Sequence, residues 1–286
     1  MRILPGFITA ITLASSAVLW AADVAADVAA ETVNPEADRQ AFVSFYKNRF
    51  PDIDIQAHKD GAYALDPAKR AQWQAMEDFP PYEIAVDEGR ELFSVAFTNG
   101  KTYADCFARQ GIGIKQEFPH FDMDQNTVVT LELAINQCRV ANNEAELDYD
   151  SDEMGVITAY MAFTSRGNHF DIKVPAAGLA AYESGKQFYY ERRGKLDFSC
   201  SGCHMQATGN MLRAEILSAS VGHATHWPTY RFKWEKVGGL HKRFIECNEQ
   251  VGAVALPQQS EAYRNLEYFL TYMSNGMELN GPASRK

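Results

Sequence analysis

The sequence has little cysteine and little positive charge for its length. It has five cysteines in 286 residues, and 27 lysines and arginines against 37 aspartates and glutamates, for a formal net charge of −10. This acidic balance argues against nucleic acids and anionic membranes as partners. The sequence also lacks a second apolar run as long as Ile3 to Trp20, so no membrane span is expected beyond that segment.

The apolar run near the N-terminus is typical of a cleaved secretory signal. Arg2 precedes it, and pairs of alanines follow it at 21–22, 25–26 and 29–30. We therefore expect a signal peptide over residues 1–22, with cleavage between residues 21 and 30, and a mature protein in the periplasm. An uncleaved anchor is the alternative, because the run approaches the length of a short span. The remaining chain, about 260 residues, is long enough for two domains.

The most specific motif is C-x-x-C-H, formed by Cys200, Cys203 and His204. This spacing lets two thiols add to the vinyl groups of one haem, while the histidine binds the iron as proximal ligand. A redox C-x-x-C pair would not require the histidine. A zinc site would need two further ligands, for which His223 and His226 are the nearest candidates. The motif therefore predicts haem c.

One pattern occurs twice along the chain. Short helical segments at 88–93 and 183–189 each lead, through a turn that contains glycine, to a cysteine. These cysteines are Cys106 and Cys200. The pattern predicts two short helices that each bring a cysteine to a turn.

The second part of each repeat strengthens this interpretation. Apolar helices at 157–167 and 266–276 both end in glycine, and the offset between them equals the offset between Cys138 and Cys247. Two unrelated helix pairs of similar pattern are the alternative explanation. We expect two similar lobes joined at residues 173–178: a first lobe of residues 31–172 and a second lobe of residues 173–286.

Each lobe resembles a class I cytochrome c domain, which has the same order of helix, haem-bearing turn, loop and closing helix. The resemblance implies a mainly α fold made of two tandem domains. In the first lobe, Cys106 is followed by Phe107-Ala108-Arg109-Gln110, which provides neither a second cysteine nor an adjacent histidine. The first lobe is therefore expected to be degenerate and without haem, and the chain to carry one covalently bound haem c.

Three cysteines remain, and in an oxidising compartment an odd number leaves one thiol without a disulfide partner. If the first lobe keeps the fold without haem, Cys106 and Cys138 face each other across the vacant haem space. We then expect a disulfide between them, which would stabilise the lobe by roughly 3 to 4 kcal/mol according to the chain-entropy description. Cys247 is left as the unpaired thiol, on the opposite side of the haem from His204.

The sequence leaves three residue types as candidates for the distal iron ligand. Cys247 is favoured, because the repeat places it at the position of Cys138. A thiolate would lower the reduction potential of the iron relative to a methionine ligand. The competing methionines are Met205, Met211, Met273 and Met277. The competing histidines are His223, His226 and His241.

Basic and aromatic residues are interleaved between residues 227 and 247. If the segment that leads into Cys247 is helical, Arg243 lies one turn before it on the same face, close to the sulfur. Such an arginine lowers the pKa of a thiol and can bind an oxyanion through two hydrogen bonds. Alternatively, Arg243 binds a haem propionate or solvates the surface.

Taken together, these residues resemble the SoxA family, the catalytic subunits of the SoxAX cytochromes of periplasmic sulfur oxidation. The resemblance covers essentially the whole mature chain and rests on W-P-x-Y-R, then L-H-K-R-F-x-x-C, downstream of a single C-x-x-C-H. Many members carry a second haem in the first lobe. Residues 106–110 depart from that pattern, so the chain resembles the members with one haem and a disulfide instead.

The family resemblance implies an L-cysteine S-thiosulfotransferase. Such an enzyme oxidatively joins thiosulfate to a cysteine of the carrier protein SoxY and passes the electrons to cytochrome c. By match with the family motif, Cys200 and Cys203 bind haem covalently and His204 is an axial iron ligand. Cys247 is then both the second axial ligand and the catalytic cysteine, modified to a persulfide, and Arg243 binds substrate. A small SoxX-like cytochrome c subunit is the implied heterodimer partner.

Two other classes of function remain open from the sequence. A plain periplasmic electron-transfer cytochrome c would need the haem but neither Arg243 nor a modified cysteine. A haem-binding assembly protein would use its acidic body for docking and would function without Cys247. The loss or survival of thiosulfate conjugation after removal of Cys247 distinguishes the enzyme from both.

Overall fold

Most of the regular structure is helical in the computed structural model, which describes residues 33–213 and 215–286. The predicted signal segment, residues 1–22, lies outside these ranges. The helices of the described chain are α1 Pro35–Arg49, α2 Pro67–Met76, α3 Glu83–Ser94, α4 Leu131–Ala141, α5 Asp152–Phe163, α6 Leu179–Tyr190, α7 Leu240–Gln250 and α8 Glu261–Met273. The prediction of a mainly α chain is confirmed. Among the described helices, none is both long enough and apolar enough to cross a bilayer.

The strands are short and form small sheets. Their bounds are β1 His120–Asp122, β2 Thr127–Val129, β3 Met211–Leu212, β4 Glu215–Ile216, β5 Thr229–Arg231, β6 Lys236–Gly238 and β7 Ala283–Arg285. Antiparallel hairpins join β1 to β2, β3 to β4 and β5 to β6, and β7 adds to β5 in parallel. The three-stranded sheet therefore joins residues 229–238 to the distant segment 283–285.

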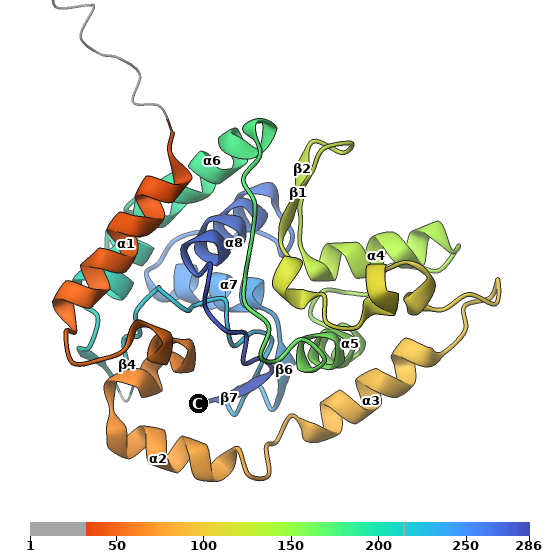
Figure 1. The fold of residues 1–286 in the computed structure, drawn as a ribbon, viewed down its shortest axis with the longest axis horizontal. Coiled ribbons are helices and arrows are strands. Elements are labelled where there is room, and N and C mark those ends of the chain that lie inside the picture. Colours follow the sequence, from red (N-terminus) through yellow and green to blue (C-terminus); the bar gives the residue numbers. More distant parts are fainter. Residues whose placement is uncertain (1–32, 214) are drawn as a thin grey trace, which may run out of the picture. The chain divides into compact units, whose positions relative to one another are not determined.

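Two helix pairs cross in the same way, α3 with α5 and α6 with α8 (Figure 1). A Cβ atom on Gly89 would lie 1.9 Å from the carbonyl oxygen of Val156. A Cβ atom on Gly185 would lie 2.0 Å from the carbonyl oxygen of Asn265. Only glycine permits backbones to approach this closely. Val156 and Asn265 are related by the same offset as the apolar helices of the sequence repeat.

The next helix of each lobe also follows the repeat. The β1–β2 hairpin leads into α4, which carries Cys138, and the β5–β6 hairpin leads into α7, which carries Cys247. Their registers match, since His120 pairs with Val129 and Thr229 pairs with Gly238. The two cysteines thus occupy equivalent places on equivalent helices.

The cores of the two lobes differ in composition. The first lobe buries a mixed aliphatic and aromatic cluster that includes Phe93, Ile135 and Met154. The second lobe packs aromatic rings between its crossing helices, with Tyr182 and Tyr189 of α6 lying 5.5 and 5.4 Å from Phe269 of α8, measured between ring centroids. These aromatic rings bury a large apolar area around the C-x-x-C-H turn.

The N-terminal helix α1 packs against the second lobe, although the sequence placed it in the first. In Figure 1, α1 lies along α6, and Asp38 accepts hydrogen bonds from Lys186 and Tyr182, each at 2.9 Å. Tyr46 donates a 2.6 Å hydrogen bond to the backbone oxygen of His204. Residues 35–286 form one compact unit, in which this early segment supports the haem motif.

A buried polar cluster connects the two lobes. Lys115 of the first lobe lies 3.7 Å from Glu267 of α8, and Glu267 lies 3.1 Å from Nε2 of His241 on α7. The backbone of Gln259 donates to Nδ1 of His241 at 3.0 Å, and its side-chain oxygen accepts a 2.7 Å hydrogen bond from Thr130 of the first lobe. Burial alone would raise the pKa of Glu267, but His241 and Lys115 lower it. The start of α7 is therefore fixed from both lobes.

Candidate functional site

Cys200 and Cys203 lie in a tight helical turn that continues through Gly202–Gln206. Both thiols are free and half-buried, and the hydroxyl of Ser199 accepts a 2.9 Å hydrogen bond from the backbone of Gly202. Burial raises the pKa of Cys200 to about 12 and also raises that of Cys203. A redox pair needs a thiol with a lowered pKa, so these neutral thiols do not fit the redox alternative.

His204 is prepared to bind a metal through Nε2. Its Nδ1 lies 2.9 Å from the backbone oxygen of Ser218, which can only accept, so the ring proton is on Nδ1. Burial lowers the pKa of His204 to about 4 and keeps the ring neutral. A second hydrogen bond that fixes the tautomer is the usual arrangement for an iron-bound histidine.

The helical relation expected between Arg243 and Cys247 is present in α7. Cys247 is a free, half-buried cysteine. It interacts electrostatically with Cys200, Cys203 and Arg243. The structure thus brings the three free cysteines and the arginine together.

Glu246 is the residue of this site that the sequence interpretation missed. Its Oε2 accepts from Arg243 at 3.0 Å, and its Oε1 accepts from Lys233 at 2.7 Å and from the indole of Trp234 at 2.9 Å. Burial opposes ionisation, but these three hydrogen bonds lower the pKa of Glu246 to about 2. Its position three residues after Arg243 on the predicted helix was the available signal. Glu246 fixes the guanidinium of Arg243 beside Cys247 and balances part of the local positive charge.

The competing methionines lie in several places. Met205 and Met273 line one small pocket of about 220 Å³ between α1, α6 and α8. Met211 is 55% exposed on β3, and Met277 is buried beyond α8. None of these positions is in α7, where the repeat places the distal residue.

The competing histidines are all buried or half-buried. His223 stacks edge to face on His204, with 4.4 Å between ring centroids, so it lies beside the proximal residue. His226 is buried next to Trp227, with 5.9 Å between ring centroids. His241 is held by Glu267 and Gln259 in the interlobe cluster.

The donor set at this site is suited to covalently bound haem c. Two neutral thiols lie at the spacing required for thioether bonds, and a neutral imidazole next to them keeps Nε2 free. Cys247 contributes a third sulfur from another helix. Haem would therefore be attached through Cys200 and Cys203 and bound by His204, with Cys247 as the candidate for the second axial position.

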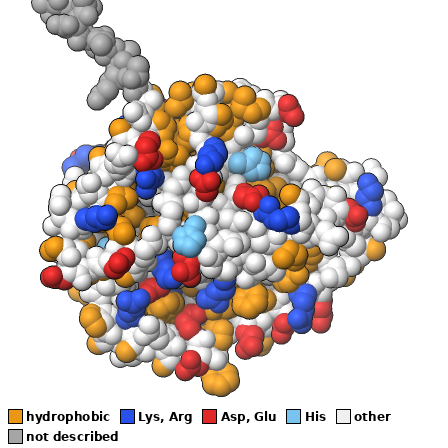
Figure 2. Space-filling model, in the orientation of Figure 1, with side chains coloured by type: hydrophobic (Ala, Val, Ile, Leu, Met, Phe, Trp, Pro, Cys, Tyr) orange, Lys and Arg blue, Asp and Glu red, His pale blue; other side chains and the backbone are white. Residues whose placement is uncertain are grey.

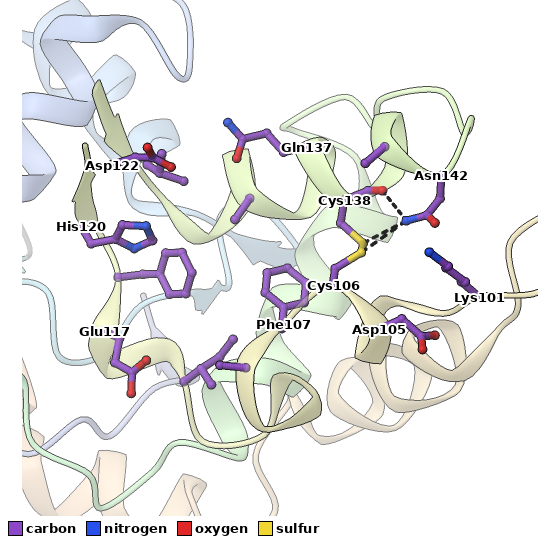
Figure 3. Close-up of a pocket in the computed structure, with 16 residues that line it drawn as sticks. Lys101, Asp105, Cys106, Phe107, Glu117, His120, Asp122, Gln137, Cys138 and Asn142 are labelled. Carbon is purple, nitrogen blue, oxygen red and sulfur yellow. Dashed lines mark hydrogen bonds between the residues drawn. A yellow bond between two sulfur atoms is a disulfide. The ribbon is translucent and has the colours of Figure 1, made fainter. Parts of the chain in front are cut away.

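The first lobe contains a disulfide where the second lobe has its haem motif. Cys106 and Cys138 are bonded, with 1.98 Å between sulfurs and 5.8 Å between Cα atoms. They line a cleft of about 560 Å³ together with Phe107, Phe118 and His120 (Figure 3). Asn142 closes one end and donates to the backbone oxygen of Cys138 at 2.8 Å. Burial lowers the pKa of His120, so this ring remains neutral.

The surface carries both signs of charge. On the face shown in Figure 2, acidic and basic side chains are interspersed. The basic side chains around α7 are also partly paired, because Lys233 binds Glu246 and Lys242 binds Asp150, each at 2.7 Å. The positive cluster expected from the sequence is thus a partly neutralised network.

Comparisons with known proteins show which family the chain resembles. The family model "SoxA/TsdA, cytochrome c domain" matches residues 88–170. The L-cysteine S-thiosulfotransferase subunit SoxA of Allochromatium vinosum is 48% identical over 255 residues, covering 88% of this chain and 90% of that protein. The corresponding subunit of Chlorobaculum tepidum is 48% identical over 252 residues, covering 88% of each chain.

A solved structure shares the architecture. The crystal structure of SoxXA from P. pantotrophus matches with a TM-score of 0.70 and 26% identity, covering 76% of this chain and 84% of that chain. The similarity to the curated relatives extends through both lobes, including the C-x-x-C-H turn and α7. The chain therefore belongs to the SoxA family of cytochrome c proteins.

Proposed function

We propose that this protein is the SoxA subunit of an L-cysteine S-thiosulfotransferase, acting in the periplasm in sulfur oxidation. The observation that carries the proposal is the placement of Arg243 one helical turn before the free Cys247, next to the C-x-x-C-H thiols. A plain electron-transfer cytochrome c has no need for a fixed arginine beside a free sulfur.

The reaction joins thiosulfate to a carrier thiol. The carrier R–SH and thiosulfate (S₂O₃²⁻) give R–S–S–SO₃⁻, one proton and two electrons. A sulfur–sulfur bond forms, the carrier thiol loses its proton, and external cytochrome c accepts both electrons. The implied carrier is a SoxY-type protein, whose cysteine is the substrate.

The second lobe supplies the residues for this chemistry. Cys200 and Cys203 would hold one haem c covalently, and His204 and Cys247 would bind its iron. The bound haem supplies one-electron redox chemistry. Cys247, as a persulfide, would use its outer sulfur as the attachment point for the thiosulfate sulfur or the carrier thiol and would be regenerated at the end of the reaction given above. Arg243 would hold the sulfonate oxygens of thiosulfate by charge-assisted hydrogen bonds. Glu246 keeps the arginine in place.

The first lobe is proposed to be a degenerate cytochrome c domain that has no haem and is closed by the Cys106–Cys138 disulfide. Two observations support a tandem repeat. Each crossing helix pair meets at a glycine, and α4 and α7 are separated along the chain by the same number of residues as the other equivalent elements. The repeat boundary near residue 173 then divides the chain into the first and second lobes. Helix α1, at the N-terminal end of the first lobe, packs against the second lobe.

The partners follow from the same proposal. The solved relative is a SoxXA complex. A small SoxX-like cytochrome c subunit would form a heterodimer with this chain, and the carrier would reach Cys247 from the surface between them. Release into the periplasm would follow cleavage of the signal at residues 21–30.

The direct test is the Cys247→Ala variant, purified with its partner subunit. We expect thiosulfate conjugation to the carrier to become undetectable, while haem attachment at Cys200 and Cys203 survives. Met277→Leu is the matched control, because it changes a buried sulfur of the same lobe outside α7. Retained turnover in Cys247→Ala would refute the proposal and favour the electron carrier.

Intact-protein mass spectrometry tests the cofactor and modifications in one measurement. The mature chain should carry one haem, lack two protons at the disulfide and gain one sulfur at Cys247. Two haems, or a mass without the extra sulfur in active protein, would contradict the assignment.

A further inference from the structure

Four buried hydrogen-bonding atoms around β5 have no partner within the described chain. They are Nδ1 of His226, Oγ1 of Thr229, Nε of Arg231 and Nη2 of Arg285. A buried polar atom without a partner destabilises the fold, so four in one place require an explanation. Two of them belong to guanidinium groups, which can only donate. The missing partner must therefore accept hydrogen bonds.

Strand register places the two arginines side by side. In the parallel pairing of β5 with β7, Arg231 is opposite Arg285 and Thr229 is opposite Ala283. Residues paired across a ladder point to the same face of the sheet. Thr229 lies two residues before Arg231 and so shares this face. The two guanidinium groups and the hydroxyl thus emerge on one side.

Arg285 is held rigidly in this position. It is 7% exposed, and its guanidinium carbon lies 5.2 Å from the ring centroid of Tyr63 and 5.4 Å from that of Trp73. Gly61 packs closely against it, where its lack of a side chain leaves room for the guanidinium. A Cβ atom on Gly61 would lie 3.5 Å from Nη2 of Arg285 and 3.3 Å from Cε1 of His226. The orphan atoms of Arg285 and His226 therefore flank the same point.

The neighbouring carboxylates are already occupied. Asp60 is paired with Arg70 and accepts from Asn280 at 3.1 Å. Glu77 lies 3.8 Å from Arg166 and accepts from the backbone of Ser284 at 3.1 Å. No ion pair within the described residues joins Arg285 to either of these carboxylates. Asp60 and Glu77 therefore balance its buried charge electrostatically, but without a direct ion pair in the described part of the chain.

This cationic group is continuous with the thiol site. Arg231 interacts electrostatically with Arg243, Cys247 and Arg285. Its guanidinium carbon lies 5.2 Å from the ring centroid of Trp234, and Trp234 donates to Glu246, which holds Arg243. The orphan donors are thus coupled electrostatically to Arg243 and Cys247 through Arg231.

We propose that Arg231 and Arg285, with Thr229 and His226, form a carboxylate site that takes the haem propionates, which makes β7 part of the haem pocket. The inference rests on the proposed function, since it requires haem at Cys200, Cys203 and His204. Two carboxylates match two guanidinium groups in charge and in hydrogen-bonding geometry. The sulfonate group of thiosulfate has the same acceptor chemistry, and the test separates these two sources.

The test uses the full-length, haem-loaded protein with its partner subunit. Arg231→Gln and Arg285→Gln each remove one positive charge, and Arg285→Lys keeps the charge but loses the planar fork. Lys236→Gln is the matched control: it lies opposite Arg231 on β6, but Asp152 already pairs with it at 3.2 Å. The readouts are haem content, midpoint potential, the propionate bands in resonance Raman spectra, and KM for thiosulfate.

We expect both glutamine variants to lower the midpoint potential, because a nearby positive charge favours the reduced haem, and to shift the propionate bands. Arg285→Lys should shift the bands with a smaller change of potential. Lys236→Gln should leave both unchanged. KM for thiosulfate should remain within about twofold of wild type in all variants, a difference of about 0.4 kcal/mol.

Two outcomes would overturn the inference. Unchanged potential and propionate bands in haem-loaded Arg231→Gln and Arg285→Gln would show that these residues do not contact the propionates. A several-fold increase in KM for thiosulfate with unchanged bands would assign the donors to the substrate instead. If Arg285→Gln fails to fold, Arg231→Gln and Arg285→Lys decide the question. Absence of haem from the wild-type protein would refute the proposed function itself, before any variant is compared.

Discussion

Helices α4 and α7 occupy equivalent places in the two lobes but carry different chemistry. Each follows a short hairpin, and their first residues are related by the offset of the sequence repeat. Cys138 on α4 is bonded to Cys106, whereas Cys247 on α7 lies near two cysteines and remains free. The other equivalent pairs at the site are Ala134 with Arg243 and Gln137 with Glu246. The comparison teaches that the cysteine is shared, while the charged residues beside it and the C-x-x-C-H turn are found only in the second lobe.

Removal of the disulfide tests whether the first lobe depends on it for stability. The bonded cysteines are separated by 32 residues, and opening this loop in Cys106→Ala/Cys138→Ala should cost about 3 to 4 kcal/mol. Urea unfolding measures the loss. Haem content and thiosulfate turnover should be unchanged at low temperature, because the bond is remote from α7. Loss of haem with unchanged stability would contradict the division of roles between the lobes.

Arg243→Ala gives α7 the residue that α4 has at Ala134. Loss of the charge that holds the sulfonate should lower kcat/KM for thiosulfate about a hundredfold, or roughly 2.7 kcal/mol. Lys242→Ala is the control, since it removes a neighbouring positive charge that pairs with Asp150 at 2.7 Å. Equal losses in both variants would indicate a general charge effect instead of a substrate contact.

The glycine crossings can be compared directly. Gly89→Ala and Gly185→Ala should each destabilise the protein by about 2 kcal/mol, because the new methyl group forces two helix backbones apart. Only Gly185→Ala should also reduce haem incorporation, since α6 and α8 enclose the haem motif. Ser184→Ala, at an exposed position of α6, is the control and should be nearly neutral. Haem loss in Gly89→Ala would show that haem incorporation depends on both glycine crossings.

Glu246→Gln gives α7 the residue that α4 has at Gln137, and its effect should depend on pH. The pKa of Glu246 is about 2 in the folded protein, below its ordinary value of 4.5. Its ionised form therefore stabilises the fold above pH 4.5, and this contribution disappears as the pH falls toward 2. Glu246→Gln should cost about 1 to 2 kcal/mol at pH 7 and less at pH 3. Urea unfolding at both pH values measures this, and equal costs would show that Glu246 acts through packing instead.

Local sequence patterns were sufficient to predict the helices that carry the repeat. The segments 157–167 and 266–276 correspond to the second parts of α5 and α8, which begin earlier, after Ser151 and Ser260. The predicted ends were wrong, because α5 ends at Phe163 and α8 at Met273, before the glycines. Gly167 and Gly276 have φ above +80° in the turns that follow. Periodicity therefore identified the helices but not their exact starts and ends.

Long-range contacts could not be predicted in this way. Nothing in the sequence near Arg285 indicates that β7 returns to pair with β5, because the pairing joins segments that are far apart in the chain, with α7 and α8 between them. The packing of α1 on the second lobe likewise depends on Tyr46 and Asp38 meeting residues far along the chain. By contrast, Arg243 and Cys247 lie on one helix, so their proximity followed from spacing alone.

The interlobe cluster makes the stability of the second lobe depend on the first. Lys115 from one lobe and His241 from the other share Glu267, and none of the three is open to water. A gene encoding only the second lobe would leave Glu267 without its lysine, and breaking a buried ion pair costs about 3 to 5 kcal/mol. The second lobe produced alone should therefore be less stable than the same residues in the full chain.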